Sequence, residues 1–192
     1  MFYRPEDGHG LPHNPFKAVV SPRPIGWISS RAKGFGDNLA PYSFFNAVGD
    51  NPPQVMFSGD PNDSVANALA SGVFAVNVVE EAAWLRMNET SAGVARGVDE
   101  FALAGVAKAE CETIDCPRVA DAPATLECVV VHHVALEGEN HLIVGRVTGL
   151  HLRDDCLVNG RFDVTRYVPV SRLGYMDYSF TREVTALKRP KA

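Results

Sequence analysis

The sequence predicts one mainly β domain built from antiparallel strands, and three observations support this. Two long strand-like segments, residues 125–136 and 141–152, are joined by the four residues EGEN at 137–140, as in a tight hairpin. The β-branched run VFAVNVV at 73–79 is typical of a central strand. A second hairpin turn is expected at 33–37, where two glycines fall within five residues. Strands joined by short turns therefore dominate the chain.

Composition limits the function classes. The chain has 192 residues, of which 46% are hydrophobic, enough for one packed domain over 1–192. Its core is expected at about 16–178, with irregular termini at 1–15 and 181–192. The net charge of −5 argues against a nucleic acid partner. No run of 18 apolar residues predicts a membrane helix, and the absence of a secretory signal favours a cytoplasmic location.

The four cysteines, at 111, 116, 128 and 156, lack the spacing of metal ligands. We expect reduced thiols and no metal site. Of the histidines, His132 and His133 are adjacent on one strand and point to opposite faces, so at most one can line a given site. A structural role is expected for both, and His141 is the better candidate for reaching a ligand.

The first half of the chain is expected to form several strands. Residues 16–20 read as a first strand after an irregular lead-in, and residues 25–30 read as a second. Residues 38–45 return after the 33–37 turn and are broken by Pro41. A further short strand is expected at 54–58, after two prolines.

We expect a few short helices in the connections between the strands of this β framework. Residues 62–72 form a helix capped by Asn62 or Asp63 and stopped by Gly72. Its free N–H groups can bind phosphate, although a plain connecting helix remains the alternative. Residues 80–88 and 98–105 are also expected to be helical. The stretches 89–97 and 107–123 read as loops.

Polar and aromatic residues gather near the strand ends between 22 and 60. This mixture suits a flat, anionic aromatic ligand, because hydroxyl and amide groups bind phosphate and aromatic rings cover a ring system. The alternative is an ordinary sheet with aromatic residues in its core and serines in its turns. The residues concerned are Ser29, Ser30, Ser43, Asn46 and Ser58, with Trp27, Tyr42, Phe44 and Phe45 beside them.

A series of segments resembles one known family. PRPIGWISS, NLAPYSFFNAV, NPPQVMFS and DSVANALASGVFAVNVV follow one another as in the flavin reductase-like, FMN-binding split-barrel proteins. The resemblance continues through MNETSAGV, DEFALAGV, PRVADAPATLEC and RLGYMDY, and covers about 16–178. It implies a Greek-key split β-barrel of about six strands with a few short peripheral helices.

The resemblance also implies a function. It implies FMN bound without a covalent bond, no metal, and no catalytic side chain, because the flavin carries the chemistry. The implied activity is that of an NAD(P)H:flavin oxidoreductase, with NADH or NADPH giving a hydride to the flavin. A monooxygenase that receives reduced flavin is an implied partner, as is a second copy in a homodimer. FAD in place of FMN stays open, and an FMN-containing electron-transfer protein without its own nicotinamide site is the alternative.

The residues that match the family's cofactor-binding segments are Trp27, Ser29, Ser30, Arg31, Ala40, Pro41, Tyr42, Ser43, Phe44, Asp63, Ser64, Asn67 and Arg172. Two positions depart from the family pattern. Asn62 stands where many relatives carry lysine, which leaves Arg31, Arg23 or a second subunit to neutralise the phosphate. Tyr175 stands where relatives often have glycine, and it is expected to cover the flavin or narrow the nicotinamide channel.

Overall fold

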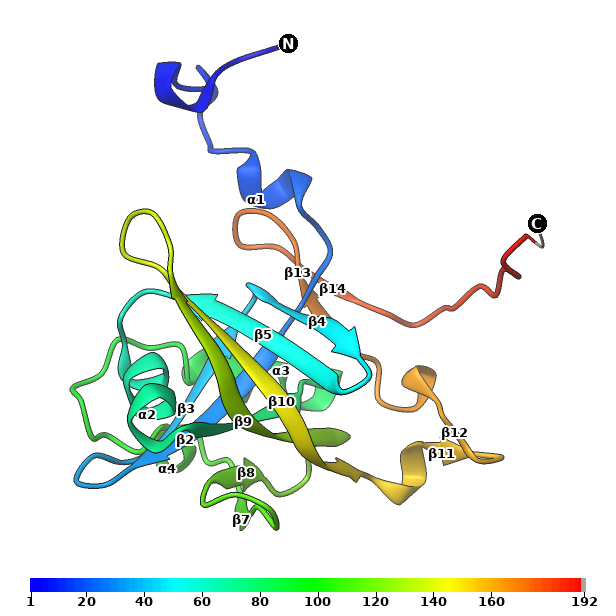
Figure 1. Cartoon of the computed structure of the whole chain (residues 1–192). Helices are drawn as coiled ribbons and strands as arrows, with labels where there is room; N and C mark the ends of the chain where they lie inside the picture. Colours follow the sequence, from blue (N-terminus) through cyan, green and yellow to red (C-terminus); the bar gives the residue numbers. More distant parts are fainter. Residues whose placement is uncertain (191–192) are drawn as a thin grey trace.

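The computed structural model describes residues 1–190 and centres on a seven-stranded antiparallel sheet (Figure 1). In spatial order its strands are β3 (Gly36–Tyr42), β2 (Gly26–Ala32), β6 (Val73–Val78), β9 (Ala124–Ala135), β10 (His141–Leu152), β5 (Pro53–Gly59) and β4 (Phe45–Asp50). The sheet curls until β4, at one edge, approaches β2, next to the other edge: a Cβ built on Gly26 in β2 would lie 2.7 Å from the Phe45 ring in β4. The expected β-rich barrel is confirmed, with seven strands in its main sheet.

Three small sheets and short helices surround this barrel. The sheets are β1 (Arg23–Pro24) with β13 (Val170–Arg172) and β14 (Tyr178–Phe180), β7 (Lys108–Glu110) with β8 (Pro117–Val119), and β11 (Leu157–Val158) with β12 (Arg161–Phe162). The α-helices are α1 (Phe16–Val19), α2 (Asp63–Ser71), α3 (Trp84–Glu89) and α4 (Glu100–Leu103). Single 3₁₀ turns cover Pro5–Asp7, Glu81–Ala83, Asp154–Cys156 and Val164–Arg166. Within residues 1–190, no helix is long and apolar enough to cross a membrane.

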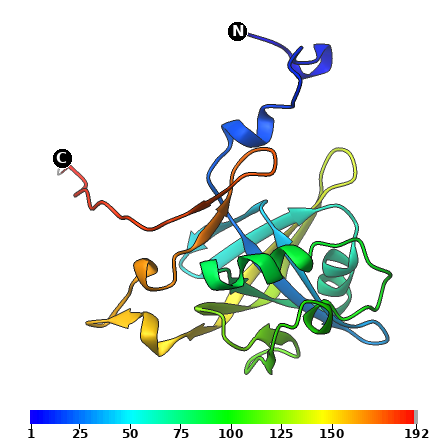
Figure 2. The same ribbon diagram turned by 180° about the vertical axis from the view of Figure 1, so that it is seen from behind.

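The core is divided into two apolar clusters by the alternation of side chains along the strands. Ile28 of β2 packs with Phe57 and Phe74 inside the barrel, and α2 closes this cluster with Val65. Trp27, the preceding residue, packs in the other cluster, together with Met87, Phe101 and other apolar residues. Figure 2 shows α3 and α4 in front of the sheet on that side. A cavity lies on this side, where the loop after α3 and the start of α4 face the edge of the sheet.

The helix α2 forms as its local sequence dictates. The Asn62 side chain accepts a hydrogen bond from the Val65 amide and so caps the first turn. The helix ends at Gly72, which has a φ of +74°, a backbone conformation that favours glycine. The predicted helix at 62–72 is confirmed, and so is the hairpin at 137–140, where the Leu136 amide donates to the Asn140 carbonyl.

Two predictions about strands are wrong. Residues 16–19, within the strand expected at 16–20, form the short helix α1: the Asn14 side chain accepts from the Phe16 amide, and among residues 1–190 no strand pairs with this segment. Residues 38–45 are not one strand: β3 ends at Tyr42, the chain bends, and β4 begins at Phe45. Proline does not break β3, because this strand lies at the edge of the sheet. The expected loop at 107–123 contains the small β7–β8 pair.

The chain ends leave the barrel in both views (Figures 1 and 2). Residues 1–15 hold only the single turn Pro5–Asp7, and no helix or strand occurs between 181 and 190. The last two residues of the expected irregular tail lie outside the described part of the chain.

Candidate functional site

A cavity of about 520 Å³, here called the Tyr42 cavity, opens beside the edge of the sheet. It is lined by Asn38, Ala40, Pro41 and Tyr42 of β3, Asn62, Asp63 and Ser64 at the start of α2, Thr90, Ser91, Ala92, Gly93, Val94 and Arg96 of the loop after α3, and Glu100 of α4. Three segments that are distant in sequence therefore meet around one space. Its volume is within the range of about 300–1,000 Å³ that is usual for small-molecule sites.

One wall is the free edge of β3. The Leu39 amide, which points away from β2, donates to Glu100 Oε2 at 3.1 Å, and Asn38 Nδ2 donates to Oε1 at 3.0 Å. Pro41 lies two residues further along, so its missing amide also belongs on the side away from β2. Glu100 is buried, and this burial raises the pKa of its carboxyl. Glu100, and not a further strand, therefore holds this part of the β3 edge in place.

Tyr42 connects this wall to α2. Its hydroxyl donates to Asn62 Oδ1 at 2.6 Å, and its ring packs edge-on against Phe57. Burial raises the pKa of Tyr42 to about 12, so the hydroxyl stays protonated and keeps donating at neutral pH. Gly59 leaves room for the ring, since a Cβ there would lie 2.5 Å from Tyr42 Cε1. Asn62 therefore both caps the helix and anchors this tyrosine.

The start of α2 offers donors to an anion. Among residues 1–190, the amides of Asp63 and Ser64 have no acceptor, as expected for the first positions of a helix. The Ser64 hydroxyl donates to Asn38 Oδ1 at 2.6 Å, which ties the helix start to β3. Backbone N–H groups and the positive end of the helix dipole together favour a negatively charged ligand here.

The third wall is the loop after α3. Thr90 is buried; its hydroxyl accepts from Trp27 Nε1 at 2.9 Å and donates to the Met87 carbonyl at 2.7 Å. Arg96 supplies the cation of this wall, with its guanidinium 3.7 Å from the Phe35 ring centroid and Nε 3.8 Å from Asp63 Oδ1. The sequence prediction missed Arg96. The available signal was a single cation within the small, polar stretch 89–97.

The structure brings only some of the predicted cofactor residues to this cavity. Those that line it are Ala40, Pro41, Tyr42, Asp63 and Ser64. Ser43 and Arg172 line a smaller neighbouring cavity, and the Phe44 ring lies beside the cations of Lys17 and Arg23. His133 and His141 contact each other near the β9–β10 turn, with 2.7 Å between ring nitrogens, and line neither cavity.

Four other predicted residues are buried away from the cavity. Trp27 stands behind Thr90, and the Ser29 hydroxyl accepts from Asn77. Ser30 donates to Asn38 at 3.4 Å. Asn67 is buried in α2, and its Oδ1 has no hydrogen-bond partner within the described residues. These side chains can support the cavity walls, but as placed they do not face the space.

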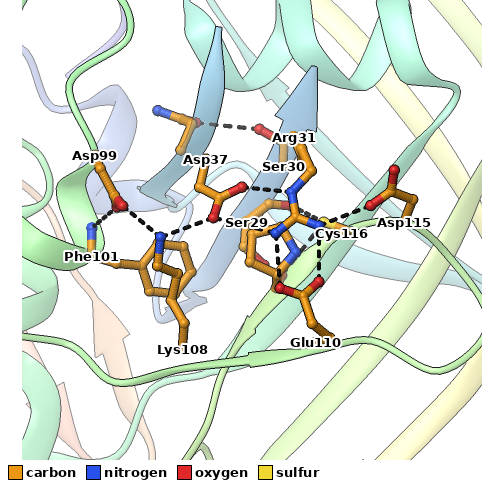
Figure 3. A network of polar contacts seen from close by, with 12 residues as sticks. Ser29, Ser30, Arg31, Asp37, Asp99, Phe101, Lys108, Glu110, Asp115 and Cys116 are labelled. Carbon is orange, nitrogen blue, oxygen red and sulfur yellow. Dashed lines mark hydrogen bonds and ion pairs between the residues drawn. The ribbon is translucent and has the colours of Figure 1, made fainter. Parts of the chain in front are cut away.

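Arg31 is held elsewhere, as Figure 3 shows. Its guanidinium contacts Asp37 at 2.7 Å and Glu110 and Asp115 at 2.8 Å each. The Glu110 and Asp37 carboxylates raise the pKa of Arg31, and Lys108 bridges Asp37 to Asp99 on the same side. With three carboxylates around it and no contact with the Tyr42 cavity, Arg31 does not supply the expected counter-charge for a phosphate.

Comparisons with known proteins agree with this architecture. A family model described as a flavin reductase like domain matches residues 20–180. A protein of Deinococcus radiodurans is 38% identical over 186 residues, covering 90% of this chain and 82% of that protein. Nitrilotriacetate monooxygenase component B from Bacillus cereus superposes with a TM-score of 0.86 and 30% identity, covering 94% of this chain and 100% of that one. A split barrel domain protein from Shewanella frigidimarina shares the fold, with a TM-score of 0.85 at 18% identity over 91% of this chain and 90% of that one. The chain therefore belongs to the family of flavin reductase-like domains and has its split β-barrel fold.

Proposed function

We propose that the Tyr42 cavity binds FMN and that the chain is an NAD(P)H-dependent flavin reductase. The observation that carries the proposal is a cavity of suitable size, with anion donors at one end and a fixed strand edge along its wall. The donor set fits a phosphate, because two free amides at the helix start and one arginine converge there. Membership in the flavin reductase-like family supports the same ligand.

Each wall has a role in this proposal. The start of α2 and Arg96 hold the phosphate, and the β3 edge from Ala40 to Tyr42 positions the ring system. When bound, FMN supplies the chemistry, because it accepts a hydride and passes electrons on. The residues of the chain bind and orient the reactants and keep water away, which requires no catalytic acid or base. NADH or NADPH is the proposed hydride donor.

The similarity to a monooxygenase component supports a proposal about the acceptor. We infer that reduced flavin is delivered to a separate monooxygenase. All four cysteines are free thiols in the structure, which supports a reducing compartment such as the cytoplasm. We also propose that the whole chain is one domain that works as a homodimer, as expected from its family.

The test of flavin binding uses Arg96→Gln. The side chain of Arg96 is 44% exposed, so the variant should fold. Losing one charged donor costs roughly 1.5–3 kcal/mol, so the Kd for FMN should rise about tenfold or more. Riboflavin lacks the phosphate and should bind the variant and the wild type alike. Calorimetry with both ligands measures the difference, with Arg161→Gln as a control because Arg161 is exposed and does not line the cavity.

The activity test is an anaerobic titration of the FMN-loaded protein with NADH and with NADPH, followed by absorption. Rapid bleaching of the flavin by either nucleotide is the expected result. If FMN binds but neither nucleotide reduces it, the protein would be an electron-transfer protein and not a reductase. Folded protein that binds no FMN would refute the proposal as a whole.

A further inference from the structure

A second cavity, of about 180 Å³, adjoins the Tyr42 cavity and shares Pro41 and Ser91 with it. Two of its other walls are the N-terminal segment around Lys17 and the β13–β14 hairpin, and residues of β1, β3 and α3 also line it. These parts pack closely, because a Cβ on Gly174 would lie 2.4 Å from the Ala18 Cβ. This space is here called the arginine pocket.

The charge of the arginine pocket is entirely positive. Lys17, Arg23 and Arg172 line it, and none of the aspartates or glutamates among residues 1–190 does. Within residues 1–190, none of these three cations forms an ion pair with a carboxylate. The whole chain carries a net charge of −5, so a cluster of three unpaired cations is a local exception.

Arg23 is the most informative member of this cluster, because it is only 6% exposed. Its guanidinium donates to the backbone carbonyls of Lys17, Val20 and Leu173. Burial, and then the charge of Arg172, lower the pKa of Arg23. Carbonyl oxygens satisfy the N–H groups but do not cancel the full charge. A buried charge without a counter-ion is costly, so the arrangement favours an anion in the pocket.

Arg172 is held so that it faces the same space. Its Nη1 donates to the Tyr178 hydroxyl at 2.5 Å and its Nη2 to the Tyr175 carbonyl at 2.6 Å. Its guanidinium also lies 4.5 Å from the Tyr178 ring centroid. Tyr175 is held at a φ of +57°, which is strained for a residue other than glycine. Such strain is common at ligand sites, and the turn that carries it lines this pocket.

The remaining walls suit a ring. Ile25, Met87 and Pro41 give apolar surface, and Tyr178 adds an aromatic face. The volume of about 180 Å³ is below the roughly 300 Å³ at which pockets for larger ligands begin. A dinucleotide would therefore exceed it, whereas a single ring with one small substituent would not.

We propose that the arginine pocket binds a small aromatic acid, with its carboxylate toward Arg23, Arg172 and Lys17 and its ring between Met87 and Tyr178. Such a ligand would lie beside the contents of the Tyr42 cavity. That adjacency to flavin rests on the proposed function, whereas binding of the acid does not. The phosphates of a nucleotide are also anions and would suit the same three cations, so the experiment must distinguish an aromatic carboxylate from a nucleotide phosphate.

The test is a titration of the full chain, followed by two-dimensional NMR, with benzoate, benzamide and ADP-ribose as probes. Benzoate should bind with shifts at residues of the arginine pocket, and benzamide, which has the same shape without the charge, should bind at least about tenfold more weakly. Arg172→Gln and Lys17→Gln should each weaken benzoate by about tenfold. Arg161→Gln should not, because Arg161 lies outside the pocket.

Three results would overturn the proposal. Equal affinity for benzoate and benzamide would show that the charge of the ligand does not matter. The absence of any benzoate binding would show that the pocket is not a site for aromatic acids. ADP-ribose binding that depends on Arg172, without benzoate binding, would assign the cations to nucleotide phosphates. Lys17 is exposed, so Lys17→Gln keeps the test readable if Arg172→Gln disturbs its turn. The benzoate titration uses the protein without FMN, so its result does not depend on whether the protein binds FMN.

Discussion

Buried polar side chains in this chain hold strands and loops together. Asn77 is fully buried, and all its hydrogen-bonding groups are used: Nδ2 donates to the Trp27 carbonyl and the Ser29 hydroxyl, and Oδ1 accepts from the Val119 amide and the Thr125 hydroxyl. A serine on a strand therefore serves packing as readily as ligand binding. Hydroxyl residues near strand ends cannot be assigned to one role from sequence, because the partner comes from a distant segment.

Glu127 supports a prediction about pH. Burial alone would raise the pKa of this carboxyl, but hydrogen bonds from Thr113, the Glu112 amide and His151 outweigh burial and lower it to about 2. The value expected without these contacts is about 4.5, so the stabilisation is complete above that pH and is lost as the pH falls toward 2. Glu127→Gln should therefore lower the unfolding free energy most at pH 7, by up to about 3 kcal/mol, and much less at pH 3.

Urea unfolding at the two pH values measures this effect of Glu127. The matched control is Glu137→Gln, since Glu137 is exposed in the β9–β10 turn. A stability loss for Glu127→Gln that is the same at pH 7 and pH 3 would show that packing, not the charge, makes the contribution.

Among the helices and strands, those whose ends are marked by a local sequence signal were predicted correctly. The helix α2 has a capping asparagine and a terminal glycine, and the β9–β10 hairpin has a short turn, so both follow from sequence. The strand β4 was missed because its residues are mostly exposed and lack a β-branched run. The helix α1 was mistaken for a strand because four apolar-rich residues fit either structure until a neighbour is known.

The end of α2 gives a second prediction. Gly72 has a φ of +74° and open space around its Cα, so alanine there meets no atom but must adopt the left-handed conformation. Gly72→Ala should destabilise the protein by roughly 1–2 kcal/mol, which lowers Tm by several degrees. Gly93→Ala is the matched control, because Gly93 also has open space but no positive φ. Equal melting temperatures for the two variants in thermal denaturation would contradict the conformational argument.

At the scale of the whole molecule, the fold was predictable because an ordered series of loose motifs identifies a family that no single motif does. The cavity was predictable only in part. Ala40, Pro41 and Tyr42 come from one matched strand. Glu100 lies in the matched segment DEFALAGV but was not singled out as a site residue, and Arg96 lies between matched segments. The sequence around Trp27 did not show which face of the sheet its indole points to, because successive side chains of a strand alternate between the two cores.

The proposed homodimer gives the third prediction. The long β9–β10 hairpin and the edge strand β4 expose several large apolar side chains, and such residues are enriched in stable interfaces. They are Val48, Val131, Val134, Leu136 and Leu150. We expect a dimer that buries on the order of 2,000 Å² or more. Val134→Asp should dissociate it, and light scattering at micromolar concentration measures the mass.

Leu187→Asp is the control for this dimer test, because Leu187 is 95% exposed in the C-terminal segment. Wild-type protein with a monomer mass would contradict the proposed dimer. A Val134→Asp variant that remains a folded dimer would place the interface on another face.

The hydrogen bond from Trp27 to Thr90 has an optical consequence. Trp27 is one of two tryptophans, and a single side chain separates its indole from the Tyr42 cavity. An isoalloxazine absorbs light at the wavelengths where indole emits, so a flavin in the cavity would quench Trp27 by energy transfer. The other indole, Trp84, lies against Tyr178 and Phe180 and can be replaced by phenylalanine to remove its signal. The remaining fluorescence would then follow the filling and emptying of the cavity in real time, without any added dye.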